Sequence, residues 1–174
     1  MTGTLFDDIC SKARAFAGVT PEREKVLHDL VPAVLPHLDV VTNHFYTHLQ
    51  NIPRAAPLLE GRLPTLRRAH RAALEDMFRS AYDAAYVGRL YRIGQAHVRA
   101  HLPIEFMVGG STTVAESLVP VVVDLCDGDA GRERIAYEAV NAALGFGLMV
   151  MLESYQISNL LEVQAGSTHG PGPS

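Results

Sequence analysis

Apolar residues recur along most of this chain every three to four positions, which is the period of a helix with one buried face. Glycines, prolines and short polar stretches interrupt the pattern. Together these signals predict helices at 5–16, 21–36, 37–50, 63–80, 83–100, 104–125 and 133–163, with at most one more turn inside 51–61. No stretch alternates apolar and polar residues as a strand does, and no segment repeats. The sequence therefore predicts a layered all-α domain of seven or eight helices.

Local signals place some helix ends. Thr20, Pro21 and Glu22 form a typical start, because threonine caps the first turn, proline suits it and glutamate complements the helix dipole. Residues 127–131 are predicted to form a loop before the last helix. We expect the domain to span 1–163 and the Gly-, Pro- and Ser-rich residues 164–174 to be a flexible tail or the start of a linker.

Composition narrows the class of protein. A chain of 174 residues with 48% hydrophobic and 20% charged residues is long enough and apolar enough for one globular domain. Fifteen basic residues against 19 acidic ones give a net charge of −4, which argues against a nucleic-acid partner. We find no run of about 18 apolar residues for a membrane span and no signal peptide. The two cysteines form no zinc pattern and fit a reducing cytoplasm.

The last two predicted helices are unusually apolar for their length. Each carries a stripe of large apolar residues at helical spacing, namely Val114, Leu118, Val121 and Leu125 on one and Leu144, Leu148, Met151 and Tyr155 on the other. These stripes suit the core of the domain, and they also suit a seam between two copies of the chain. The sequence leaves both interpretations open.

Eight histidines need individual explanations. A carboxylate-bridged di-iron bundle is excluded, because no histidine has an acidic residue three positions before it. The pairs His44/His48 and His97/His101 have the i, i+4 spacing of a zinc site, but coincidence is the more common cause in a His-rich chain. His37, His44 and His48 share the polar face of their helix, so we expect them in solvent.

Two other side chains point to chemistry inside the domain. Tyr46 lies on the apolar face of its helix, where its hydroxyl needs a partner: either a backbone carbonyl or a bound ligand. His97 ends an apolar stripe formed by Tyr86, Leu90 and Ile93. It is either a core histidine or the single axial ligand of a buried metal macrocycle, since neutral imidazole is a common haem ligand.

Several short segments resemble the sensor-globin family, the haem domains of globin-coupled sensors, which are related to protoglobins. The resemblance covers residues 20–161, nearly the whole chain. Its most specific part is the run from Arg92 to Arg99, which contains Ile-Gly-x-x-His-x-Arg. It is also carried by Phe45-Tyr46, Met77-Phe78, Tyr86-Val87, Leu102-Pro103 and Phe106-Met107-Val108-Gly109-Gly110.

The resemblance implies a globin fold with an extra N-terminal helix, a shortened or absent D region and long last two helices. It implies that His97 is the proximal ligand of haem b and that Tyr46 is the distal hydrogen-bond donor to bound O2, with CO and NO as other ligands. It also implies a homodimer through the last two helices. His70 lies either in the core or in the distal lining of the haem slot. The candidate cofactor contacts are Phe45, Tyr46, Leu49, Leu66, Ala69, His70, Ile93, His97 and Phe106.

The chain departs from the family pattern at four places. Phe106-Met107 stands where Trp-Tyr is common, and Ala69 where a distal Thr or Ser is common. His101 stands where Gly is usual, and Ala73 where a histidine is usual, with His70 nearby. We expect these changes to alter ligand affinity more than haem binding.

Three functions follow from these residues. The leading hypothesis is a haem-based O2 sensor domain, without catalytic activity of its own, that transmits its state through the dimer interface. An output domain would then lie beyond Ser174, or the chain is a single-domain sensor globin. The first alternative is a haem-free globin-like dimerising signalling module. The second is an O2- and NO-reactive globin with dioxygenase-type activity, for which the chain carries no GxGxxG fingerprint of a reductase.

Overall fold

The computed structural model describes residues 4–167, and every regular element in that part of the chain is helical. A short 3₁₀ turn, η1 (Leu35–His37), connects the second and third α-helices. The α-helices are α1 (Leu5–Ala17), α2 (Pro21–Val34), α3 (Leu38–Gln50), α4 (Ala56–Leu59), α5 (Leu63–Arg79), α6 (Ala84–Arg99), α7 (Ile104–Asp124) and α8 (Ala130–Ser167). The predicted all-α architecture is confirmed, including the single turn inside 51–61.

Short polar side chains cap the starts of α1, α2, α6 and α8. The Thr20 hydroxyl oxygen accepts a hydrogen bond of 3.3 Å from the Arg23 amide, and Pro21 opens α2, as predicted. At the start of α6, an Asp83 carboxylate oxygen accepts one of 2.9 Å from the Tyr86 amide. These bonds satisfy amides that have no partner inside the helix.

The break expected between 21–36 and 37–50 is present, because α2 ends at Val34 and η1 separates it from α3, while Pro32 lies inside α2. Two other boundaries differ from the predictions. The last helix begins three residues before 133, because an Asp129 carboxylate oxygen accepts hydrogen bonds from the amides of Gly131 and Arg132 and caps it there. It continues to Ser167, past the expected domain end at 163. Residues 168–174 of the expected tail lie outside the described residues.

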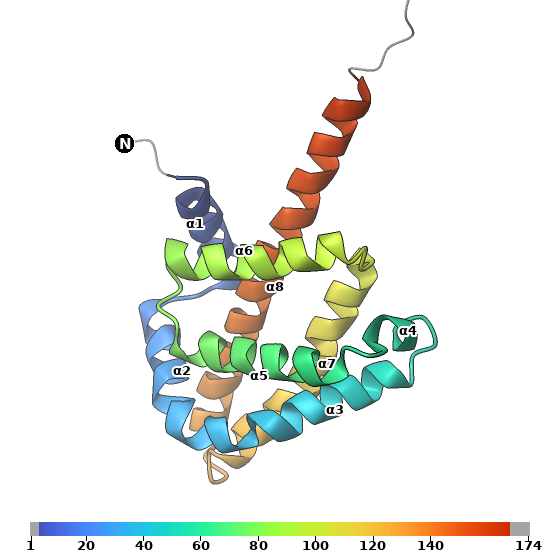
Figure 1. Cartoon of the computed structure of the whole chain (residues 1–174). Coiled ribbons are helices and arrows are strands. Elements are labelled where there is room, and N and C mark those ends of the chain that lie inside the picture. The colour runs from blue at the N-terminus through green and yellow to red at the C-terminus, as the bar shows by residue number, and fades with distance from the viewer. Residues whose placement is uncertain (1–3, 168–174) are drawn as a thin grey trace, which may run out of the picture.

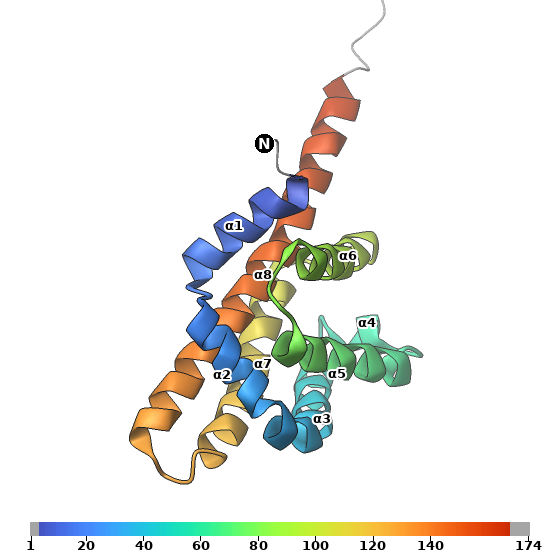
Figure 2. The ribbon, with the colours of Figure 1, turned by 90° about the vertical axis from the view of Figure 1, so that its left-hand side faces the viewer.

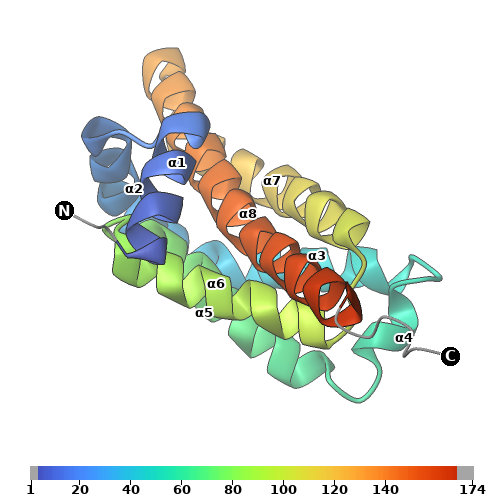
Figure 3. The ribbon, with the colours of Figure 1, turned by 90° about the horizontal axis from the view of Figure 1, so that it is seen from above.

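Helix α8 is the central helix of the domain. It packs against α1, α2, α6 and α7, and in the view from above it runs the length of the molecule with α7 along one side (Figure 3). Its middle is fully buried at Val140, Phe146 and Val150. The C-terminal end of α8 projects past α6 (Figure 1). The core therefore forms around α8, and the other helices are positioned relative to it.

Helices α5 and α6 lie at different levels on the same side of α8 (Figures 1 and 2). Helix α5 packs on α2 and α3, whereas α6 packs on α1 and α8. Near the turn that connects them, the Arg89 guanidinium pairs with the Asp76 carboxylate at 2.7 Å and donates to the Ser80 hydroxyl at 2.8 Å. Helices α5 and α6 run in opposite directions (Figure 1). The first half of α5 and the second half of α6 therefore lie at the end of the pair that is far from this turn and from the Arg89 contacts.

Helices α7 and α8 are long and apolar enough to cross a membrane by length and composition alone. In this fold they pack against each other as core helices. Both keep large apolar side chains in solvent: Ile104 and Val108 on α7 are 49% and 50% exposed, and Ile135 and Tyr137 on α8 are 44% and 49% exposed. This apolar surface is available to a partner.

Candidate functional site

The first half of the candidate site is on α3, where Tyr46 is 6% exposed and points into the domain as predicted. Its hydroxyl donates a hydrogen bond of 3.1 Å to the backbone carbonyl of Leu66 on α5. Burial raises the pKa of Tyr46 to about 12, so the phenol is protonated and available as a donor at neutral pH. Of the two partners that the sequence left open for the Tyr46 hydroxyl, the structure shows the backbone carbonyl.

An aromatic cluster holds the Tyr46 ring. The Phe45 and His70 rings are stacked, with centroids 4.4 Å apart and planes 8° apart, and both meet the Tyr46 ring edge to face. His70 Nδ1 lies 3.2 Å from the Thr42 hydroxyl oxygen. Burial lowers the pKa of His70 to about 4, so the ring is neutral. The structure therefore brings Phe45, Tyr46 and His70 together.

The second half of the site is His97, in the last turn of α6. Its predicted neighbours on the same stripe, Tyr86 and Leu90, are buried at 2% and 6% exposure. Within residues 4–167, His97 Nδ1 is buried and has no hydrogen-bond partner. Burial also lowers the pKa of this imidazole, which keeps it neutral and leaves a lone pair for a metal. Buried polar atoms in proteins usually have a hydrogen-bond partner, and His97 Nδ1 has none among the described residues.

The remaining candidates surround these two halves less closely. Leu66 supplies the carbonyl for Tyr46 and is half-buried, whereas Ala69, one turn along α5, is exposed. Ile93 is partly buried and packs against the core. Phe106, at the start of α7, lies under the guanidinium of Arg54 at 5.7 Å. Leu49 is half-buried near the end of α3.

Four other histidines lie at the surface of the domain. His37, His44 and His48 are exposed, which confirms the prediction for that face of α3. His101 is exposed and has a positive φ of 51°, in the turn after α6. Among the described residues, no three His, Cys, Asp or Glu side chains gather to hold a metal ion.

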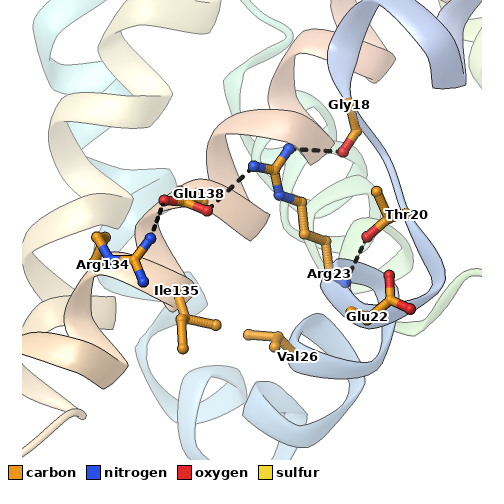
Figure 4. Close-up of a pocket in the computed structure, with 8 residues that line it drawn as sticks. All are labelled: Gly18, Thr20, Glu22, Arg23, Val26, Arg134, Ile135 and Glu138. Atoms are coloured by element: carbon orange, nitrogen blue, oxygen red, sulfur yellow. Dashed lines mark hydrogen bonds and ion pairs between the residues drawn. The ribbon is translucent and has the colours of Figure 1, made fainter.

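Two surface hollows lie elsewhere. One, of about 480 Å³, lies between the start of α2 and the first half of α8 (Figure 4). There the Arg23 guanidinium bonds the Gly18 carbonyl at 2.8 Å and the Glu138 carboxylate at 3.2 Å, and Arg134 pairs with Glu138 at 2.8 Å. The other, of about 470 Å³, lies beside α4. Three of the four charged side chains in the first hollow, Arg23, Arg134 and Glu138, pair with one another, so it carries no comparable chemistry.

Sequence reasoning missed the partners of the predicted residues. Leu66 was proposed as lining, and its role as the carbonyl acceptor for Tyr46 follows only from the way α3 meets α5. The structure also shows the Thr42 hydroxyl beside His70 Nδ1, a contact that the sequence analysis did not predict. A buried threonine four residues before Tyr46 was the available signal.

Comparison with known proteins identifies relatives of this fold. The family model described as Protoglobin matches residues 7–160. No curated protein sequence matches the chain. The solved globin domain of the Geobacter sulfurreducens globin-coupled sensor is 27% identical, covers 83% of this chain and 96% of its own, and superposes with a TM-score of 0.77.

More distant structures share the fold. The ferric globin domain of E. coli DosC is 16% identical, covers 84% of this chain and 99% of its own, and gives a TM-score of 0.70. Its ferrous form is 15% identical and gives a TM-score of 0.69, covering 83% and 97%. These matches confirm the predicted globin fold with an additional N-terminal helix.

Proposed function

This chain belongs to the protoglobin family, and we propose that it is a sensor domain that binds haem b through His97 and a diatomic gas, foremost O2, on the side of Tyr46. Haem, when bound, supplies a ferrous iron with one open position for the gas. The relative most informative for this chain is described as the globin domain of a globin-coupled sensor. We propose the same role for this chain.

The observation that supports haem binding most directly is the unpartnered imidazole of His97. A core histidine would be expected to bond a carbonyl or a hydroxyl, as His70 does with Thr42. His97 has no such partner within residues 4–167, although its Nδ1 is buried. A neutral, desolvated imidazole at the end of an apolar stripe fits an axial ligand of a porphyrin.

Tyr46 would select the gas. Its protonated phenol now bonds the Leu66 carbonyl, and it would give up that bond to donate to the gas ligand. Bound O2 carries partial negative charge and accepts a hydrogen bond well, whereas CO accepts one poorly. Phe45 and His70 restrict the ring, so the hydroxyl exchanges partners without a change of packing around it.

The exposed apolar residues on α7 and α8 would form the contact between two subunits. Ile104, Val108, Ile135 and Tyr137 leave apolar surface in solvent on the two helices that the sequence singled out for a dimer seam. Burying that surface in a symmetric pair would stabilise a homodimer. The gas-bound state would be transmitted through this interface.

Absorption spectra of the purified protein after haem addition test the proposal. We expect a Soret band in the ferric protein that shifts on reduction with dithionite and shifts again when O2 or CO is added. Bovine serum albumin mixed with the same haem is the control for non-specific uptake. A protein that takes up no haem would contradict the proposal and leave the haem-free dimerising module as the function.

A further inference from the structure

Three residues before His97, the backbone of α6 lies directly against the backbone of α8. A Cβ atom built on Gly94 would lie 2.6 Å from the Met151 carbonyl oxygen and 3.0 Å from Met151 Cα, and it would overlap the Ser154 hydroxyl. By contrast, a Cβ built on Gly109 of α7 would meet nothing within 4 Å. The two helices therefore cross this closely only because residue 94 has no side chain.

The surface of α8 that faces Gly94 is fully packed. Ser154 is fully buried, and its hydroxyl donates a hydrogen bond of 2.6 Å to the Met151 carbonyl, the same carbonyl that faces Gly94. One turn of α6 earlier on the same side, Leu90 would meet a Cβ built on Gly147 at 4.0 Å. A packed contact of this kind leaves no room for α6 to slide or rise, so a displacement of α6 must move α8 or break the contact.

A second contact ties the other side of His97 to α8. The Tyr155 hydroxyl donates a hydrogen bond of 3.0 Å to the Leu102 carbonyl, in the turn that follows α6, and Tyr155 is only 9% exposed. Gly94 and Leu102 thus bracket His97 in the sequence. Both are held by the same turn and a half of α8.

The His97 ring has no anchor of its own. Metal-ligating histidines usually give their second nitrogen to a carbonyl or a carboxylate, which fixes the ring. Within the described residues, His97 Nδ1 has no such partner. A force on this imidazole therefore passes into the α6 backbone, and from there into the two contacts with α8.

We propose that the α6–α8 crossing at Gly94, together with the Tyr155–Leu102 hydrogen bond, couples the gas-binding state at His97 to the C-terminal part of α8. This inference rests on the proposed function, in which His97 holds the haem. The helix leaves the body of the domain just after the crossing, and its end projects past α6 (Figures 1 and 2). Coupling between binding sites is reciprocal, so a change that loosens the crossing must also change gas affinity.

Hydrogen–deuterium exchange of the haem-loaded chain, ferrous with and without CO, measures this coupling. We expect CO to change the exchange of the amides in residues 151–163 severalfold in the wild type. Gly94→Ala and Tyr155→Phe should bind haem but lose at least half of that CO response, and each should change the CO dissociation rate at least twofold. If Gly94→Ala does not fold, Tyr155→Phe, which removes a single oxygen, decides the question.

The controls are Gly109→Ala, where the new methyl group meets open space, and Asn141→Ala, at an exposed position of α8. Both should keep the full CO response and the wild-type CO dissociation rate. A merely structural role of the crossing would raise exchange equally with and without CO, and that result would overturn the coupling. So would a haem-loaded wild type whose α8 does not respond to CO, whereas failure to load haem would overturn the proposed function instead.

Discussion

The two halves of the candidate site differ in how well the protein alone satisfies them. On the α3–α5 side, the Tyr46 hydroxyl bonds the Leu66 carbonyl and His70 bonds Thr42, so both polar rings have a partner, although Arg67 Nε on α5 is buried without one in the described part of the chain. On the α6 side, His97 is buried with no partner within residues 4–167. The difference teaches that the protein itself supplies partners for the polar rings of the first half, whereas it supplies none for His97 Nδ1 among the described residues.

The largest expected effect comes from removing the unsatisfied group. His97→Ala deletes the only ligand that we assign to the haem, so we expect the protein to lose its Soret band or release haem rapidly to an acceptor such as apomyoglobin. Folding should be retained, because no protein partner of His97 is lost. Circular dichroism checks the fold, and His101→Ala, at an exposed position, is the matched control. If His101→Ala abolished haem binding and His97→Ala did not, the two histidines would have to exchange roles.

The next largest expected effect is a pH dependence of the free energy of unfolding that arises from His70, on the α3–α5 side of the site. The pKa of His70 is about 4 in the folded chain and about 6.5 when unfolded, so the unfolded chain binds the proton more tightly. The neutral His70 ring makes its full contribution to the free energy of unfolding above pH 6.5. This contribution is lost as the pH falls to about 4, a change of up to about 3 kcal/mol. Urea unfolding of the haem-free protein at pH 7 and pH 4.5 measures it.

Replacing His70 separates this effect from general acid denaturation. His70→Phe keeps a ring to stack on Phe45 but cannot titrate, so its unfolding free energy should fall less between the two pH values. The exposed His48→Phe is the control and should behave as the wild type. An equal pH slope in all three proteins would show that His70 is not a buried neutral ring.

A smaller effect is expected at Tyr46. Tyr46→Phe keeps the ring and its packing but removes the donor, so O2 should dissociate roughly fivefold faster, as the loss of one hydrogen bond of about 1 kcal/mol implies. CO dissociation should change little, because CO is a poor acceptor. Stopped-flow kinetics on the haem-loaded protein measure both rates, with Thr47→Val, which removes an exposed hydroxyl from the same helix, as the control. An unchanged O2 rate would contradict the distal role of Tyr46.

The helices and their inward faces follow from the sequence because helical periodicity and capping are local properties. The pattern correctly placed Tyr46 inside and His37, His44 and His48 outside. Ala130 and Gly131 were wrongly placed in the loop, since the Asp129 cap that starts α8 before them depends on one side-chain rotamer.

The contacts between helices did not follow from the pattern. The bond from Tyr46 to Leu66 and the crossing of Gly94 with Met151 depend on helix packing, which periodicity does not specify. The roles of Tyr46 and His97 toward haem came from a resemblance to a family, and they remain predictions. The structure adds the unpartnered nitrogen of His97 as support that no sequence pattern contains.

The most direct test of the central claim is chemical rescue at position 97. His97→Gly removes the imidazole and leaves its space, and free imidazole added to the haem-loaded variant should restore haem retention and the spectrum of the wild type. The same addition to His101→Gly should change neither. Rescue that depends on imidazole would establish that position 97 supplies the proximal ligand. A His97→Gly protein that retains haem and its gas spectra without imidazole would contradict the account.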